Sequence, residues 1–257
     1  MRLTADFFTQ LTARNPLLFT FGLACFALAG ICLALVWMRP LEVAGANAWF
    51  KPIKFALSIG IYSWTMGWLL YDLDSPADTV AMQWAIVWLL GLELLYITVQ
   101  AARGQGSHFN LSTPFYAGMY AFMAIAAAAI SFWTGYIGLL FFVKPLPQLP
   151  DHYLWAIRIG LMLFLVFSLE GFVMGSRLSH TIGGRSHAGL PFLTWSTRFG
   201  DPRVAHFIGM HALQVLPLLS FFFLKNVKTT FLAGAMYALL AVWVLVQALQ
   251  GKPFIRM

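Results

Sequence analysis

The chain has 257 residues, of which 60% are hydrophobic and only 10% are charged, and its formal net charge is +7. Soluble globular domains are about half apolar and about one quarter charged, so this composition excludes an ordinary soluble domain. Long uncharged runs recur along the chain, which predicts a polytopic protein whose partner is the lipid bilayer. We expect no nucleic-acid binding, because the positive charge fits segments that flank membrane spans.

The chain begins with a short segment, 1–16, that has the pattern of an amphipathic helix lying on the membrane surface and ending at Pro16. Apolar runs then predict one all-α membrane helical bundle of about seven transmembrane helices, 17–249, and a short C-terminal tail, 250–257. No soluble domain and no internal repeat is expected. The predicted spans are 17–38, 52–71, 81–102, 113–143, 153–175, 204–224 and 229–249.

The distribution of Lys and Arg predicts how the chain is oriented. With seven spans, ten of these residues lie on the side of the C-terminus and six on the side of the N-terminus. The positive-inside rule then places the C-terminus in the cytoplasm and the N-terminus outside, in the inner membrane of a bacterium. This bias disappears if five of the ten serve a binding site, because the remaining count is five against six.

The sixth predicted span carries polar groups that a lipid-facing helix excludes. It begins "GDPRVAHFIGMHALQVLPLL" and contains Arg203, His206, His211 and Gln214. At about 100° per residue these four side chains share one side of a helix as a broad fan. The two histidines are five residues apart, which is not the i,i+4 spacing by which one helix chelates zinc.

Three other predicted spans carry polar stripes that lead inward from the same side of the membrane. The second contains Lys51, Lys54, Ser58, Tyr62 and Thr65 within about 80° of arc. The third contains Glu93, Tyr96, Gln100 and Arg103, and continues into a turn with Ser107, His108 and Asn110. The fifth has Glu170 and Arg177 on one face and is followed by His180.

These stripes predict a polar intramembrane cavity with a basic mouth, although polar residues such as Ser58, Thr65 and Gln100 also join membrane helices by hydrogen bonds. An intramembrane carboxylate is by default a functional candidate. The candidate catalytic residues are Glu93, Glu170 and His211. The candidate ligand-binding residues are Lys51, Lys54, Tyr62, Gln100, Arg103, His108, Asn110, Arg177, His180, Arg203, His206 and Gln214.

Three segments, "WFKPIKFALS", "VQAARGQGSHFN" and "GDPRVAHFIGMHALQVLPLL", resemble parts of a family of bacterial seven-span integral membrane proteins. The resemblance runs from the second to the sixth span. It implies no activity, and it suggests that the three segments belong together as a set.

The residues are compatible with three functions, and an enzyme, a transporter and a receptor all remain open. The first is a cavity for a small or amphipathic ligand, such as an anion or a quinone- or lipid-like molecule, bound with or without catalysis. The second is an oxidoreductase with haem or a transition metal as cofactor, its metal ligands drawn from His108, His180, His206 and His211. The third is a small-molecule transporter. The residues specify no oligomeric state.

Overall fold

The structure is a computed structural model that describes residues 2–184 and 189–256, with helical side chains described from residue 6 onward. The chain divides into two compact units, Met1–Ile130 and Ser131–Met257, and the long helix α6 (Pro114–Val143) contains their boundary. Each unit is described by itself. The all-α prediction is confirmed, because the extended structure consists of short strands and bridges in two connections.

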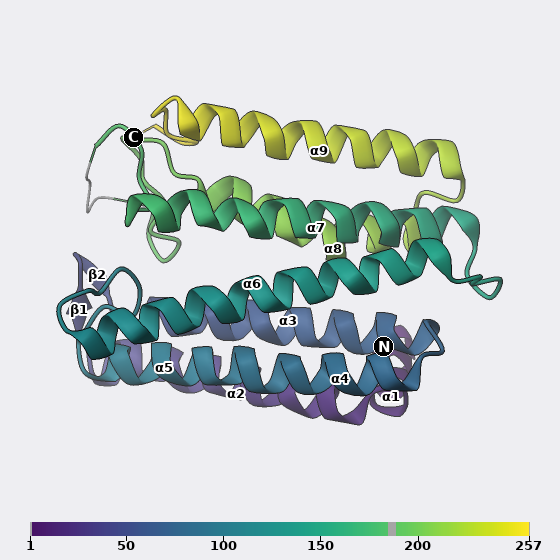
Figure 1. The fold of residues 1–257 in the computed structure, drawn as a ribbon, viewed down its shortest axis with the longest axis horizontal. Helices are drawn as coiled ribbons and strands as arrows, with labels where there is room; N and C mark the ends of the chain where they lie inside the picture. The colour runs from purple at the N-terminus through teal and green to yellow at the C-terminus, as the bar shows by residue number, and fades with distance from the viewer. Residues whose placement is uncertain (1, 185–188, 257) are drawn as a thin grey trace. The chain divides into compact units, whose positions relative to one another are not determined.

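The first unit contains α1 (Arg2–Arg14), α2 (Pro16–Met38), α3 (Phe50–Asp72) and a long helix made of α4 (Pro76–Ala85), the π-helical turn η1 (Ile86–Leu90) and α5 (Gly91–Ala102). Its helices run side by side (Figure 1). A hairpin of β1 (Glu42–Val43) and β2 (Ala46–Asn47) joins α2 to α3. The two residues of its turn, Ala44 and Gly45, both have positive φ, as tight hairpin turns require.

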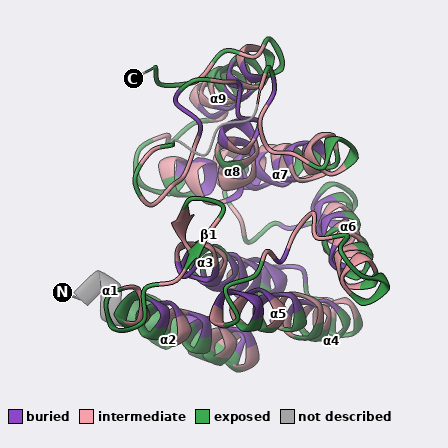
Figure 2. Cartoon of the chain, turned by 90° about the vertical axis from the view of Figure 1, so that its left-hand side faces the viewer, coloured by how far each residue is buried: buried purple, intermediate pink, exposed green. Residues whose placement is uncertain are grey.

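Helix α3 lies antiparallel to α2 and is the more deeply buried of the two (Figure 2). At one end the indole of Trp49 donates to the carbonyl oxygen of Arg39, and further along Trp64 donates to that of Phe19. Both helices have 23 residues, but twelve are buried in α3 and five in α2. A helix shielded from lipid by its neighbours tolerates polar residues. This shielding fits the buried position of Tyr62 and the half-buried positions of Lys51 and Lys54 in the stripe of the second predicted span.

The N-terminal helix α1 packs against α2 and α3. The guanidinium of Arg14 lies 3.2 Å from the carboxylate of Asp72 and 4.0 Å from the ring centroid of Trp68. Further toward the N-terminus, Phe8 contacts the ring of Trp64 at 5.3 Å between centroids. The predicted N-terminal helix is therefore present, and its apolar face covers the ends of two longer helices.

The second unit contains α7 (Asp151–Arg177), α8 (Arg203–Phe222) and α9 (Val227–Leu249). Helix α8 is the central one, and it lies antiparallel to α7. A Cβ atom on Gly209 of α8 would overlap the ring of Phe167 of α7, and one on Gly160 would lie 2.9 Å from the carbonyl oxygen of Ala212. On the other side of α8, the hydroxyl of Tyr237 in α9 donates to the carbonyl oxygen of Ile208 at 2.6 Å.

The two units share an order of elements that was not predicted from the sequence. Each has a long helix, a connection with antiparallel backbone pairing, a second helix packed tightly on the first, a short turn and a third helix. In the second unit this pairing is formed by the bridges Ile182–Gly200 and Gly189–Ser196. The middle helix of each unit carries predicted polar residues: α3 carries the stripe of the second predicted span, and α8 carries the fan of the sixth.

In the part of the chain that the structure describes, six helices are long and apolar enough to cross a membrane. They are α2, the continuous helix Pro76–Ala102, α6, α7, α8 and α9. The chain is therefore a polytopic helical membrane protein. The predicted second span is present as α3, but α3 is not one of these six, so a count of seven is not confirmed.

The close approach of α7 and α8 yields a test of the fold. Gly209→Ala should lower the free energy of unfolding by about 1–3 kcal/mol, because the added methyl group must displace Phe167. Thermal unfolding in detergent micelles, followed by tryptophan fluorescence, measures the change. Gly30→Ala is the matched control, since a Cβ there has no atom within 4 Å, and we expect a change within about 0.5 kcal/mol. Equal losses in the two variants would contradict the packing described.

Candidate functional site

The predicted site residues fall into two groups, one in each unit. The first group surrounds the junction of α5 with the connection before α6, and the second lies along the contact of α7 with α8. Each group contains a buried glutamate that faces a histidine.

In the first unit Glu93 lies in the first turn of α5 and is only 6% exposed. Its Oε1 is 3.9 Å from Nε2 of His108, in the connection after α5. The other ring nitrogen of His108, Nδ1, is 3.2 Å from the hydroxyl oxygen of Ser107. The imidazole therefore stands between a carboxylate and a hydroxyl group, with the hydroxyl at hydrogen-bond distance and the carboxylate beyond it.

The π-helical turn immediately before α5 influences where Glu93 points. A π-turn holds one residue more than an α-helical turn. The residues after it therefore lie on a different face than they would in an uninterrupted α-helix of the same sequence. Met82 and Ile86, before or at the start of this turn, are completely buried, and Glu93 follows the turn by three residues. Such turns are found frequently at functional sites.

Lys51, at the start of α3, supplies positive charge to this group. Its ammonium acts electrostatically on both Glu93 and His108 and lies 5.9 Å from the ring centroid of Phe55. Burial and, secondly, the charge of Lys51 hold the pKa of His108 well below its usual value of 6.5. His108 is consequently neutral near pH 7, with one ring nitrogen as donor and the other as acceptor.

Two amides fix the connection that carries His108. The side chains of Gln100 and Asn110 both donate to the carbonyl oxygen of Gly106, at 3.4 and 3.3 Å. Asn110 also accepts from the backbone nitrogen and the hydroxyl group of Ser112. These two predicted ligand-binding residues thus make hydrogen bonds that hold the turn in place.

The remaining predicted residues of the first unit lie at different depths. Tyr62 is buried in the core and Lys54 is half-buried, and each has an interaction within the protein. Arg103 is exposed at the end of α5. Ser58, which the sequence places in the polar stripe, is exposed on α3.

In the second unit Glu170 lies on α7, 8% exposed, opposite His206 of α8. Its Oε2 is 3.6 Å from Nδ1 of His206. Both carboxylate oxygens are buried, and neither has a hydrogen-bond partner among the described residues. A buried carboxylate without hydrogen bonds is costly, so its presence needs a functional or structural reason.

The ring orientation of His206 is set by a backbone group. Nδ1 donates to the carbonyl oxygen of Phe167, at 2.7 Å. A Cβ on Gly171, one turn further along α7, would lie 3.3 Å from Cε1 of the ring. Because Gly171 has no side chain, α7 leaves room at this position for the imidazole of His206.

His211 has a similar arrangement within α8. Its Nδ1 lies 3.2 Å from the amide oxygen of Gln214, and its ring contacts that of Phe207 at 4.4 Å between centroids. Phe207 in turn contacts Trp195, at 5.6 Å between ring centroids. The two histidines of α8 are thus both half-buried and both hydrogen-bonded through Nδ1.

Arg203 is held by hydrogen bonds within the protein. Its guanidinium forms two bonds with the carboxylate of Asp201, at 2.8 and 2.6 Å, and one with the carbonyl oxygen of Thr194, at 2.5 Å. Asp201 also accepts from the backbone nitrogen of Ser196. Asp201 is not among the predicted site residues, although an aspartate two residues before Arg203, at the start of an apolar helix, is a signal in the sequence.

The other predicted residues of the second unit lie outside this contact. Arg177 is exposed in the last turn of α7, and His180 is half-buried in the connection that follows, where it has an interaction within the protein. Arg185, which was included in the count of positive charges, lies outside the described residues. Among the described residues, no three His, Cys, Asp or Glu side chains are grouped so as to hold a metal ion.

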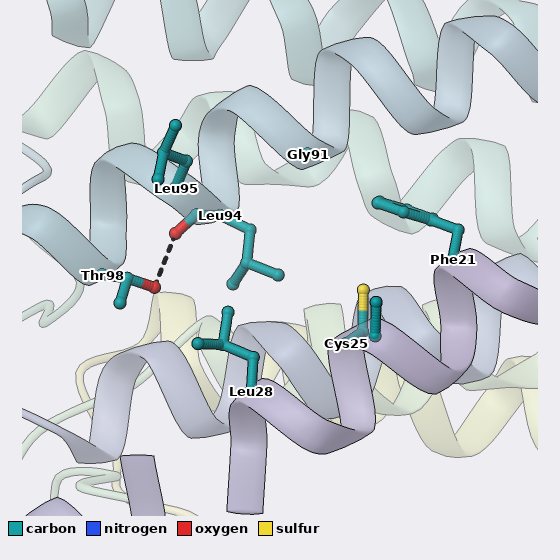
Figure 3. Close-up of a pocket in the computed structure, with 8 residues that line it drawn as sticks. Phe21, Cys25, Leu28, Gly91, Leu94, Leu95 and Thr98 are labelled. Carbon is teal, nitrogen blue, oxygen red and sulfur yellow. Dashed lines mark hydrogen bonds between the residues drawn. The ribbon is translucent and has the colours of Figure 1, made fainter. Parts of the chain in front are cut away.

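An apolar groove between α2 and α5 lies apart from both groups (Figure 3). Its lining residues are Phe21, Ala24, Cys25, Leu28, Gly91, Leu94, Leu95 and Thr98. The Thr98 hydroxyl donates to the carbonyl oxygen of Leu94, which leaves the groove with little polar surface. None of the predicted site residues lines this groove.

Comparison of the chain with protein-family models, curated proteins and solved structures finds no match. The resemblance to a bacterial membrane family therefore stays a prediction, and function has to be argued from the two groups of polar residues.

The lowered pKa of His108 predicts how stability depends on pH. The unfolded chain takes up this proton near its ordinary pKa of about 6.5, whereas the folded protein takes it up at lower pH. The free energy of unfolding should therefore fall as pH drops from about 7 to about 5, and His108→Gln should flatten this dependence. Melting temperatures across this range measure it, with His152→Gln as control. A slope unchanged in His108→Gln would contradict the assignment.

Proposed function

We propose that this protein binds a small ligand within the membrane and exchanges protons with it through buried glutamate–histidine pairs. The observation that carries the proposal is the Glu170–His206 contact, in which a carboxylate buried between membrane helices faces an imidazole and makes no described hydrogen bond. Carboxylates and imidazoles inside membrane bundles characteristically belong to ligand sites and proton relays.

The first unit supports the same function with a second pair. Glu93 faces His108, and the hydroxyl of Ser107 lies on the far side of the imidazole. A neutral imidazole between two such groups can accept a proton on one nitrogen while it releases another. The predicted basic mouth has less support than the pairs, because the guanidinium of Arg203 is engaged by Asp201 and Thr194. The transporter function stays a prediction.

We also propose that α3 crosses the membrane as a seventh span and that the chain's two ends lie on opposite sides. Helix α3 is as long as α2 and runs antiparallel to it, and the turn after Asp72 leads directly into the helix Pro76–Ala102. If α2 and that helix both cross in the same direction, α3 has to return the chain between them. The Lys and Arg count then favours a cytoplasmic C-terminus in a bacterial inner membrane.

Reporter fusions test this topology. Alkaline phosphatase fused after Gly45 should be inactive, and the same enzyme fused after Asp74 should be active, because these turns lie on opposite ends of α3. A fluorescent protein fused after Gly251 should fluoresce, as a cytoplasmic C-terminus requires. The same activity at Gly45 and Asp74 would show that α3 does not cross.

A carbodiimide that partitions into lipid tests the buried acids. It adds across a protonated carboxyl group, and the product rearranges to a stable N-acylurea that mass spectrometry locates. Glu170 should be modified, because the proposed function requires its carboxyl group to take up a proton, and Glu170→Gln should abolish that adduct. Asp151, which is exposed at the start of α7, is the control, because a reagent dissolved in lipid should not reach it. Modification of Asp151 as fast as Glu170, or no modification of Glu170, would contradict the proposed acid–base site.

A further inference from the structure

Arg158 is a charged residue within a membrane helix that belongs to neither glutamate–histidine pair. It is the eighth residue of α7, about 10 Å along the helix axis from Asp151, and its side chain is half-buried. An arginine at that depth is costly unless its charge reaches a partner or the headgroup region. Glu170 lies about 18 Å further along α7, so Arg158 needs an explanation of its own.

Three contacts fix the guanidinium of Arg158. Its Nε donates to the carbonyl oxygen of Phe141, in the last turn of α6, at 2.9 Å. Its central carbon lies 5.0 Å from the ring centroid of Phe142 and 4.9 Å from that of Trp155, which precedes Arg158 by about one turn. Helical side chains lean toward the N-terminus of their helix. The side chain of Arg158 therefore leads back toward the beginning of α7, which is the direction of the membrane surface.

Most of the hydrogen-bonding capacity of this guanidinium is unused. It has five N–H groups, of which the one on Nε is engaged by Phe141. Among the described residues, no carboxylate pairs with Arg158 and no group accepts from its terminal nitrogens, Nη1 and Nη2. Neither nitrogen is enclosed by protein. Accessible N–H groups in a fixed plane match two oxygens of a phosphate group.

The rings beside Arg158 continue to a second positive charge. Trp155 contacts Phe231 of α9 at 4.7 Å between ring centroids. Lys228 precedes Phe231 by three residues, on the same side of α9, and is exposed. A cation thus lies next to each ring of the Trp155–Phe231 pair.

This end of the second unit combines positive charge with apolar surface. Segments 144–158 and 223–231 contain four Lys or Arg and one acid, Asp151. Phe142 and Phe231 are 40% and 44% exposed beside the cations. Such mixed surface is characteristic of the boundary between hydrocarbon and headgroups. The ligand that matches it carries a phosphate joined to apolar chains.

We propose that Arg158 and Lys228 bind the phosphate group of an anionic phospholipid, whose glycerol and upper acyl chains lie against Phe142, Trp155 and Phe231. The phosphate accepts from Nη1 and Nη2 of Arg158, and the charge of Lys228 favours a headgroup with net negative charge over a zwitterionic one. The site is separate from the ligand site of the proposed function and does not depend on it.

Native mass spectrometry of the purified, delipidated protein in mild detergent tests this site. The probes are phosphatidylglycerol and phosphatidylcholine with the same acyl chains, and the wild type should bind its first phosphatidylglycerol more tightly. Arg158→Gln should weaken this step roughly tenfold, because a charge-assisted contact of two hydrogen bonds is lost. Lys228→Gln should weaken it about threefold, as expected for an exposed charge.

Lys252→Gln is the matched control for Lys228→Gln. Lys228 is in the first turn of α9 and Lys252 follows its end, and both are exposed, so the two variants remove the same charge at opposite ends of one helix. Lys252→Gln should bind phosphatidylglycerol as the wild type does. Glycerol 3-phosphate should not displace the lipid, because it lacks the acyl chains that contact the rings.

Melting temperatures with and without phosphatidylglycerol distinguish lipid binding from a purely structural role of Arg158. Arg158 also holds the end of α6, so Arg158→Gln can lower stability in the absence of lipid. The lipid should raise the melting temperature of the wild type and of Lys252→Gln more than that of Lys228→Gln or Arg158→Lys, which keeps the charge but lacks the planar fork. Lys228→Gln leaves the bond to Phe141 intact, so its weaker response reports lipid binding alone.

Four results would each overturn the phospholipid site. They are equal affinities of the wild type for the two lipids, equal losses of affinity in Lys228→Gln and Lys252→Gln, wild-type affinity in a folded Arg158→Gln, and displacement of the lipid by glycerol 3-phosphate. The last result would identify a site for a soluble phosphate ester instead.

Discussion

The contact between α7 and α8 is the interaction on which the second group of polar residues depends. Lipid offers little hydrophobic drive for helices to associate, so membrane helices approach through small residues and gain packing and hydrogen bonds. Gly209 lets the ring of Phe167 sit directly against the backbone of α8. The same close approach brings the Phe167 carbonyl to His206 and places Glu170 opposite the imidazole. Packing and site geometry therefore have one cause.

Shielding of the middle helices explains where this protein keeps its polar groups. Helix α3 is covered by α2 on one side, and α8 is packed between α7 and α9. A helix with little lipid-facing surface needs fewer apolar residues, and its polar groups find partners on neighbouring helices. The exposed large apolar residues are frequent on outer helices, for example Trp37, Leu232 and Leu239. The middle helices therefore contribute histidines and lysines to the polar groups, and the glutamates come from their neighbours α5 and α7.

Much of the fold could be predicted from the sequence, because run length and periodicity decide which segments become membrane helices. Six of the seven predicted spans are present as helices that are apolar and long enough to cross a membrane. The remaining one, the second predicted span, is present as α3. The glutamate–histidine pairs were only partly predictable. Helical angles placed Glu93 and His206 among polar stripes, but the partner of each comes from another element, which periodicity within one helix does not reveal. The Phe167 carbonyl has no signature in the sequence at all.

The contacts of Arg203 show a second reason why the site could not be fully predicted from the sequence. A basic residue at the start of a membrane helix predicts a binding role as readily as a structural one. The deciding partners, Asp201 and Thr194, lie in an irregular connection whose path the sequence does not specify.

The π-turn between α4 and α5 makes this helix unusually tolerant of a change in chain length at one place. In a regular α-helix the loss of one residue turns the following part by about 100° relative to the preceding part. A π-turn holds one residue more than an α-helical turn, so the loss of one residue between 86 and 90 would restore regular α-helical bonding and leave Met82 and Glu93 near their present sides. Natural variation in the length of this helix should therefore fall within the π-turn and not in α4 or α5.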